Sequence, residues 1–466
     1  GDILVFMPGA FEIRKAAGSI EALSMGEGVK IVTLHGDAPP EVQQRAMESA
    51  DKRKIIIATN IAETSLTIPG IRHVVDSGLA RISRYDAVRG FSTLYVENIS
   101  IDSADQRAGR AGREGPGICV RLWSARSHTT RTTKTAPEIA RVDLAETLLT
   151  MAMLGFRQPE IFGWFEPPAP AMVEIACDLL TMLGARNPVT GELTPAGEAM
   201  SRLPTHPRLA RLVLESVSRG VPRLGTLVAA VLSERSAISG RPESDQREKG
   251  PVSDFLALAR ALQVARESGY DESICTRLRI QASAARRVER TQAFFLALLH
   301  RQRFPIHDSA PDASIALCQS ILLAYPDHLA HRRDKGTLFC DLRQGRRGEL
   351  SSSSCVRQSP LLVAAEIRET RDTDKRLRTV LSLASEVKEE WLLEFFPEAW
   401  EHHAALEWDS SRSCVVQSTR SICLGVVIEE NRRVPEDLDA AGTLLADIVL
   451  SKSLPLYGWG SEVENF

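Results

Sequence analysis

The sequence lacks several features that would assign a protein to a broad class at once. Its eight cysteines form no CxxC pair and no Cys/His cluster with zinc-site spacing, which predicts reduced thiols in a cytoplasmic protein and no metal site. No apolar run is long enough to cross a bilayer, so we expect no membrane partner. The net charge of −3 excludes a global basic field for polyanions. Any nucleic-acid binding must therefore use a local channel.

What is present is the composition of a soluble protein built from several domains. The 466 residues are 43% hydrophobic and 25% charged, and this length suggests roughly three or four domains. The first residue is Gly1 rather than Met, and it leads directly into ILVFM, a run typical of a buried strand. We therefore expect that further residues precede this sequence in the natural protein.

The first 125 residues alternate strand-like and helix-like stretches. Ile55, Ile56 and Ile57 show no polar alternation, as expected for a strand buried on both faces. Strands that alternate with helices predict a parallel α/β sheet. Residues 79–98 differ, because two strand-like runs flank AVRG and predict a hairpin that projects from the sheet. The predicted sheet strands lie at 3–7, 29–35, 54–58, 73–77 and 117–123.

The pattern becomes mainly helical after about residue 126. Two helical stretches are followed at 187–200 by a turn, a short strand and a new helix start, which suggests a winged-helix module. Residues 205–305 are almost entirely helical in pattern. Short strand-like runs between 336 and 430 predict a small barrel.

The stretch DQRAGRAGR places two glycines among three arginines in a pattern otherwise typical of a helix. Each glycine in a helix interior costs about 1 kcal/mol relative to alanine, so the small residues need a reason. A helix over residues 102–113 puts Gln106, Arg110 and Arg113 on one face. Arg107 then points elsewhere. An arginine pair that no nearby acid neutralises favours a polyphosphate, and the glutamine can hold an attacking water. A solvated basic helix end is the alternative.

Polar or small residues follow the predicted strands at their carboxyl ends. In α/β proteins ligands bind in the crevice at this edge of the sheet. The side chains after the strand at 54–58 can donate hydrogen bonds to a sugar-phosphate backbone, whereas ordinary turns are the alternative for each stretch taken singly. The candidates at these strand ends are Pro8, Gly9, His35, Gly36, Thr59 and Asn60.

Residues 277–303 carry seven arginines against one acid, Glu289. Arg279, Arg286 and Arg290 have the spacing of one stripe on a continuous helix, which predicts a track for nucleic-acid phosphates. A solvated helix face with partners from other domains is the alternative. A second basic cluster, at 331–336 and 343–348, surrounds the predicted barrel and has the same two readings.

Several stretches resemble the superfamily 2 DEAH-box helicases of the bacterial HrpB type. ATNIAETSLTIPGIRHVVDSGLAR and QRAGRAGR resemble motifs V and VI, and LVFMPG resembles motif IV, all from the second RecA-like domain. LTPAGEAMSRLPTHPRLARLVL resembles the junction between the winged-helix and ratchet domains, and LAYPDHLAHRR also resembles this type. The resemblance covers nearly the whole chain and is thin past about residue 430.

The resemblance implies a multidomain fold. An α/β RecA-like domain with a parallel sheet is followed by mostly α-helical domains and a small OB-like β-barrel. The implied parts are a second RecA-like domain at 1–125 with the hairpin 79–98 inserted, a winged-helix-like domain at 126–204, a ratchet-like helical domain at 205–310, an OB-like domain at 311–430, and the start of a C-terminal extension at 431–466.

The implied activity is that of an ATP-driven, 3′-to-5′ translocating helicase. Its partners are single-stranded RNA or DNA, or a duplex with a 3′ overhang, and its cofactors are ATP and Mg²⁺. By motif, Arg110 and Arg113 act as arginine fingers on the γ-phosphate, and Gln106 orders the attacking water.

The same resemblance assigns nucleic-acid roles. Thr59 and Asn60 contact the nucleic-acid backbone, and Ser65 lies at the link between the ATP and nucleic-acid sites. The 79–98 hairpin parts the strands at the duplex junction. Pro69 departs from the acidic residue that many relatives carry there, and it offers no side-chain acceptor.

The sequence contains neither a GxxxxGK[ST] loop nor a DEAH box. The groups that hold the phosphates and Mg²⁺ are therefore expected on a first RecA-like domain outside this sequence, and the chain alone is expected to be inactive. A non-hydrolysing nucleic-acid-binding or helicase-regulating module is the alternative function. Gln106, Arg110 and Arg113 favour the enzyme, because a pure binder has no need of them. Backbone contacts do not distinguish RNA from DNA.

Overall fold

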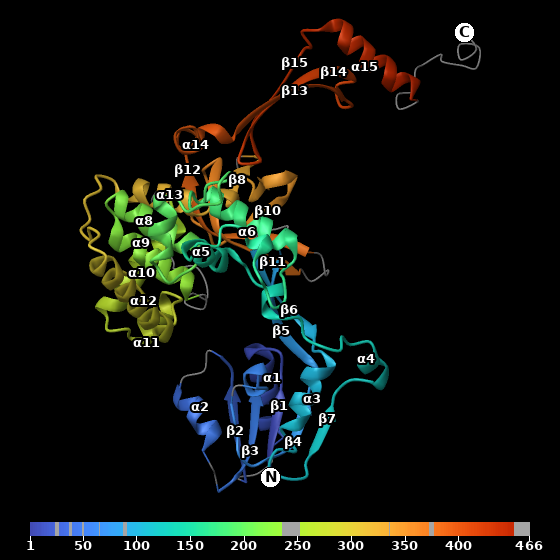
Figure 1. The fold of residues 1–466 in the computed structure, drawn as a ribbon, viewed down its shortest axis with the longest axis vertical. Helices are drawn as coiled ribbons and strands as arrows, with labels where there is room; N and C mark the ends of the chain where they lie inside the picture. The colour runs from blue at the N-terminus through green and yellow to red at the C-terminus, as the bar shows by residue number, and fades with distance from the viewer. Residues whose placement is uncertain are drawn as a thin grey trace. The chain divides into compact units, whose positions relative to one another are not determined.

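The computed structural model describes residues 1–23, 28–36, 40–48, 51–64, 66–86, 91–234, 252–334, 336–371 and 377–451 (Figure 1). The chain divides into two compact units. Unit 1 comprises Gly1–Leu144 and Glu160–Ile175, and unit 2 comprises Ala145–Pro159 and Ala176–Phe466. None of the helices in the described ranges has the length and apolar character needed to traverse a membrane.

Unit 1 is built on a five-stranded parallel sheet, as the sequence predicts (Figure 1). The strand order is β2-β3-β1-β4-β7, and every neighbouring pair is parallel. The strands are β1 (Asp2–Phe6), β2 (Val29–Leu34), β3 (Arg53–Ala58), β4 (Ile71–Asp76) and β7 (Ile118–Arg121).

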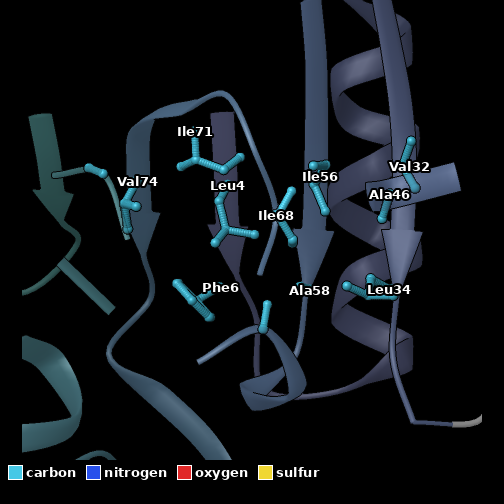
Figure 2. Packing of buried hydrophobic residues seen from close by; sticks show 12 residues of the cluster. Leu4, Phe6, Val32, Leu34, Ala46, Ile56, Ala58, Ile68, Ile71 and Val74 are labelled. Atoms are coloured by element: carbon cyan, nitrogen blue, oxygen red, sulfur yellow. The ribbon is translucent and has the colours of Figure 1, made fainter. Parts of the chain in front are cut away.

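Both faces of the sheet are covered at β1 and β3, which explains the missing polar alternation in the apolar runs of these strands. Successive side chains of β1 point to opposite faces, with Leu4 and Phe6 in one hydrophobic cluster and Val5 in another. Helix α1 (Ala10–Ala22) covers the Val5 face, and helix α2 (Pro40–Met47) contributes to the other. Figure 2 shows the Leu4 and Phe6 cluster, which continues across Ile56, Val74, Ile68 and Val32.

The predicted hairpin is present beside this sheet. Strands β5 (Leu79–Asp86) and β6 (Phe91–Asn98) are antiparallel, with Leu79 opposite Asn98 and Asp86 opposite Phe91. Residues 87–90 of the predicted turn lie outside the described residues. The hairpin leads into helix α3 (Ile101–Gly109), which carries part of the glycine- and arginine-rich stretch.

Unit 2 contains the helical region that the sequence predicts, in the part that the structure describes. Its prolines stand at the first turns of α7, α8 and α9, where a missing backbone N–H costs nothing. The short strand predicted within 187–200 is reduced to an isolated bridge between Arg186 and Leu193. The helices of this region are α4 (Ala125–Thr129, in unit 1), α5 (Ala145–Met153), α6 (Pro170–Met182, across the two units), α7 (Pro195–Ser201), α8 (Pro207–Ser218), α9 (Pro222–Ser233), α10 (Asp254–Glu267), α11 (Glu272–Arg277), α12 (Ala282–Arg301) and α13 (Ala313–Ala324).

The predicted barrel is closed but smaller than expected. Its order is β10-β12-β11-β8-β9, and β10 pairs with both β12 and β9, so no edge remains for another strand. The strand-like residues 413–430 therefore do not join it. The barrel strands are β8 (Leu329–Arg332), β9 (Phe339–Leu342), β10 (Arg347–Leu350), β11 (Leu361–Arg371) and β12 (Leu377–Val387).

The residues after the barrel form a separate antiparallel sheet of three strands. Its strands are β13 (Trp400–Asp409), β14 (Cys414–Cys423) and β15 (Val426–Arg433), preceded by α14 (Glu389–Phe395) and followed by α15 (Leu438–Leu450). The prediction that 413–430 belongs to the barrel is thus wrong, because the barrel closes by residue 387.

Candidate functional site

The carboxyl ends of the parallel strands form one edge of the unit 1 sheet. Their last residues stand in one register row, which is Leu34, Ala58, Phe6, Asp76 and Arg121. The backbone pairing continues beyond this row, since Met7 N donates to Ala58 O at 2.8 Å and Thr59 N donates to Leu34 O at 3.1 Å. The residues that follow these strands are therefore neighbours along a single edge, where α/β folds bind their ligands.

The strand-end candidates of β2 and β3 are accessible on this edge. Gly36 and Asn60 are exposed, and His35 and Thr59 are half-buried. His35 Nδ1 is buried and has no hydrogen bond within the described part of the chain. These four residues offer backbone and side-chain donors next to one another.

The candidates after β1 are less accessible. Pro8 and Gly9 are buried. Gly9 precedes α1, and a Cβ there would lie 2.7 Å from Arg81 Nε and 3.0 Å from Glu12 Oε2. A larger residue at this position would therefore displace the ends of these two side chains. Ser65 lies outside the described residues.

Helix α3 is shorter at its end than the sequence predicts. Ser100 caps its N-terminus, and Arg110 caps its C-terminus directly after Gly109. Arg113 therefore lies beyond the helix, and the prediction that it shares a helical face with Arg110 is wrong. The physical reason is the low helix propensity of Gly109 and Gly112. These glycines end the helix and do not serve as small residues on the surface of a longer one.

Arg107 points away from Arg110, as predicted, but into the interior of unit 1. It is 1% exposed, and its Nε donates to Glu63 Oε2 at 2.8 Å. Its Nη1 donates to Asp76 Oδ1 at 2.9 Å, and its guanidinium stacks on the Phe6 ring at 4.7 Å from the centroid. Ser103 Oγ donates to the second oxygen of Glu63 at 2.7 Å. Two carboxylates thus neutralise this arginine, and α3 is fastened to the strand-end edge.

Arg110 is held by carbonyl oxygens instead of carboxylates. Its Nη1 donates to Leu66 O at 2.6 Å, and its Nε donates to Glu63 O at 2.9 Å. Carbonyls orient the guanidinium without cancelling its charge. Burial, reinforced by the nearby charge of Arg113, lowers the pKa of Arg110.

Arg113 and Gln106 are both exposed. Neither side chain forms a hydrogen bond or ion pair with another of the described residues. Among the described residues no carboxylate forms an ion pair with either of these neighbouring guanidinium groups, although the Glu63 charge acts on Arg110, so an anion is favoured here.

Sequence reasoning missed the acidic partners of α3. Glu63 appears in the sequence as one of several polar residues after β3, and Asp76 ends β4 directly after Val74 and Val75. An acid at the end of a strand that is buried on both faces is the signal that could have found Asp76, because a buried charge requires a partner. Glu63 carries no comparable signal.

The basic stripe predicted on one helix is divided between two elements of unit 2. Arg279 lies between α11 and α12 with a φ of 55°, whereas Arg286 and Arg290 are exposed on α12. The prediction of a continuous helical stripe is wrong, since the chain turns through a left-handed residue at Arg279. Arg279 and Arg286 nevertheless line one open pocket of about 710 Å³.

The neighbouring charges of this region are partly compensated. Arg287 Nε donates to Glu234 Oε2 at 2.9 Å, and Glu289 accepts from Arg266 at 2.9 Å and from the Tyr270 hydroxyl. Arg286 stacks on the Tyr270 ring at 5.2 Å.

The basic cluster around the barrel is also partly compensated. Arg332 is buried and donates to Val356 O at 2.7 Å, and Arg333 pairs with Asp341 at 3.0 Å. Within the described ranges, no group of three or more His, Cys, Asp and Glu side chains could hold a metal ion.

Comparison with known proteins supports the helicase resemblance. The family described as helicase conserved C-terminal domain matches residues 1–115. The ATP-dependent RNA helicase HrpA of Escherichia coli (strain K12) is 39% identical over 268 residues, which cover 55% of this chain and 20% of that protein. The HrpA homolog of Haemophilus influenzae is 28% identical over 490 aligned positions, which cover 100% of this chain and 37% of that protein.

A solved structure of the same type matches along the whole chain. The crystal structure of the E. coli DExH-box NTPase HrpB has a TM-score of 0.72 and 25% identity, covering 100% of this chain and 52% of that one. The chain thus spans about a fifth to a half of the length of these relatives. Sequence motifs, sheet topology and these matches agree: residues 1–115 match the helicase conserved C-terminal domain, and the chain as a whole is similar to part of the HrpA- and HrpB-type helicases.

Proposed function

We propose that the chain is the part of an ATP-dependent helicase that supplies arginine fingers and nucleic-acid contacts for 3′-to-5′ translocation and unwinding. The observation that carries this proposal is the pair of neighbouring guanidinium groups, Arg110 and Arg113, that no carboxylate pairs with among the described residues. They stand beside the strand-end edge of a RecA-like sheet. The match of residues 1–115 to the helicase C-terminal domain supports the same reading.

A nucleotide polyphosphate fits these residues. Backbone carbonyls preset the orientation of Arg110, so little side-chain freedom is lost when an anion arrives. Arg113 and Gln106 are exposed and able to reach a ligand. In this proposal the two arginines face the γ-phosphate and Gln106 orders the attacking water, whereas ATP and Mg²⁺ are held mainly by a first RecA-like domain outside this chain.

Contacts with the nucleic acid are proposed separately for the strand-end edge of unit 1 and for the basic residues of unit 2. In unit 1 the backbone contacts come from Thr59, Asn60, His35 and Gly36, with Pro8 and Gly9 supporting the turn after β1, and Ser65 linking this track to the nucleotide. In unit 2 they come from Arg279, Arg286 and Arg290. The relatives named HrpA are RNA helicases, which favours RNA over DNA as the substrate.

The proposed domain limits follow the same resemblance. They are a second RecA-like domain at 1–125, a winged-helix-like domain at 126–204, a ratchet-like domain at 205–310, an OB-like domain at 311–430 and the start of an extension at 431–466. The described barrel supports the OB-like assignment for residues 329–387, whereas β13, β14 and β15 form a separate sheet.

We expect the full-length protein to hydrolyse ATP in the presence of single-stranded RNA, and this chain alone to hydrolyse none. Phosphoryl transfer needs a phosphate cradle and a metal as well as arginine fingers, and this sequence has no GxxxxGK[ST] loop. A steady-state ATPase assay on both proteins, with and without RNA, provides the test. RNA binding without hydrolysis by the full-length protein would favour the alternative, a non-hydrolysing nucleic-acid-binding or helicase-regulating module.

A second expected result concerns the basic track of unit 2. Replacing Arg286 and Arg290 with alanine should weaken binding of single-stranded RNA alike for all sequences. The slope of log K against log salt should decrease by about 1.4, since each lost phosphate contact on a single strand changes it by about 0.7. Fluorescence anisotropy over a salt series measures the slope. Arg287→Ala is the matched control on the same helix, because Glu234 already pairs with Arg287. An unchanged slope in the double variant would assign Arg286 and Arg290 to a solvated surface.

A further inference from the structure

The base of the hairpin is bound by a buried arginine that none of the helicase motifs includes. Arg131 is 8% exposed, and its Nη1 donates to Gly78 O at 2.8 Å and to Ile99 O at 2.9 Å. Gly78 directly precedes β5, and Ile99 directly follows β6. One guanidinium therefore joins the two chain segments through which the hairpin enters and leaves.

The packing around Arg131 leaves no room for a different arrangement. Its guanidinium stacks on the Trp123 ring at 4.3 Å from the centroid. Gly78 has a φ of 72°, and a Cβ there would lie 2.6 Å from Arg131 Nη2 and 2.6 Å from Trp123 Cε3. Both the backbone conformation and the close approach require glycine at this position. The hairpin base is thus built around the arginine.

The residues after Arg131 bind helix α3. The first amides of α3 donate to this segment, Ile101 N to Thr132 O at 2.9 Å and Asp102 N to Thr133 O at 3.1 Å. Residues 131–135, which we call the anchor segment, therefore contact the hairpin base at one end and the start of α3 at the other. A small hydrophobic cluster of Ala80, Ile99 and Ala104, with Ile82 and Trp123 packed against it, fills the space between the hairpin and α3.

The C-terminal half of α3 also contacts the hairpin base. Arg107 pairs with Asp76 and also donates to Leu79 O, the first residue of β5, at 3.3 Å. The Asp76 carboxylate therefore pairs with Arg107 and also acts on Arg131. Burial lowers the pKa of Arg131, and the negative charge of Asp76 opposes this shift. Arg110, the proposed phosphate contact, caps the same helix. Helix α3 and the hairpin base are therefore joined by packed side chains and hydrogen bonds.

We propose that Arg131 is a positioning residue that couples the hairpin to α3, so that displacement of α3 on nucleotide turnover moves the hairpin as one body with it. The coupling role rests on the proposed helicase function, whereas the anchoring of the hairpin does not. Loss of the anchor should leave the phosphate contacts of Arg110 and Arg113 in place. Hydrolysis should then continue while strand separation fails.

The anchor itself is tested without an activity assay. Arg131→Met retains much of the side-chain volume and the contact with Trp123, but it removes the donors to Gly78 O and Ile99 O. We expect hydrogen exchange of the β5 and β6 amides to accelerate about tenfold, with β1 and β3 unchanged. Arg126→Met, at an exposed arginine of α4, is the matched control and should change neither region. Unchanged exchange in β5 and β6 would overturn the anchor, whatever the protein's activity.

The coupling is tested by a double-mutant cycle in the full-length protein. We expect Arg131→Met to lower single-turnover unwinding about tenfold and RNA-stimulated ATP hydrolysis less than twofold. In a variant that lacks residues 86–92, the same substitution should lower unwinding no further, because it acts only through the hairpin. Arg131→Lys, which keeps the charge and one donor, should be intermediate and remains informative if the methionine variant folds poorly. Equal losses of hydrolysis and unwinding, or additive losses in the shortened variant, would overturn the coupling.

Discussion

Arg113→Ala should lower ATP turnover of the full-length protein by about 10³-fold or more. Cationic stabilisation of the transferring phosphoryl group is the contribution that we propose for this chain, and an arginine finger is worth roughly 4 kcal/mol of it. Arg113 suits this role because it is exposed and free of carboxylate partners in the described ranges, so the whole charge is available to the nucleotide. Steady-state hydrolysis at saturating ATP and RNA measures the effect.

Arg113→Lys tests whether a positive charge alone is sufficient at this position. Lysine retains the charge but not the planar pair of donors, so turnover should recover only in part. RNA affinity and the thermal unfolding temperature should be unchanged in both variants, because the Arg113 side chain forms no hydrogen bond or ion pair with the residues that the structure describes. Turnover within a few-fold of the wild type in Arg113→Ala would exclude an arginine finger at this position.

Arg107→Ala should destabilise unit 1 by about 3–5 kcal/mol. The substitution removes the cation of a buried ion-pair cluster and leaves Asp76, which is 0% exposed, without the arginine that forms its ion pair. Glu63 loses its partner as well, and α3 loses its attachment to the strand-end edge. A loss of this size is a large fraction of the stability of a typical domain. Hydrogen exchange of the β1, β3 and β4 amides reports the opening free energy of the unit directly.

An arginine on the surface of unit 1 provides the control for this prediction. Arg14→Ala, on the exposed side of α1, should change the same exchange rates by only a few tenths of a kcal/mol. Arg107→Lys should be intermediate, since an ammonium can meet one carboxylate but not both. If exchange in Arg107→Ala equalled that in Arg14→Ala, the ion pairs with Glu63 and Asp76 would contribute nothing to the fold. The measured loss of stability in Arg107→Ala also shows whether a change in its ATP turnover reflects chemistry or folding. For this reason Arg107→Ala is not an inert control for Arg113→Ala.

Local signals were enough for most elements of the fold. The strands of unit 1 were predictable because each contains a short stretch of apolar residues and is followed by polar or small residues, and the hairpin because two strand-like runs flank a turn. The helices of unit 2 followed from their 3.6-residue periodicity. The end of the barrel could not be predicted in this way. Barrel closure depends on the pairing of β10 with β12, and nothing in the sequence of residues 413–430 indicates that pairing.

The candidate site was predictable in its composition but not in its pairings. The sequence singled out Gln106, Arg110 and Arg113 by residue type and by motif resemblance. It could not show that Arg107 is neutralised, since its partners lie 44 and 31 residues away. Arg131 carried no signal at all, because its role depends on a glycine 53 residues earlier in the chain.

The sequence by itself therefore determined which segments become strands and helices, where the polar strand ends fall, and which family motifs the chain contains. These properties depend on neighbours along the chain. The tertiary structure alone decided which arginines are neutralised and which remain free, and where α3 ends relative to its cluster of charges. The reason is that charge compensation depends on distance through space: β1 lies between β3 and β4, and this order brings Glu63 and Asp76 to the same guanidinium while Arg113 is left outside.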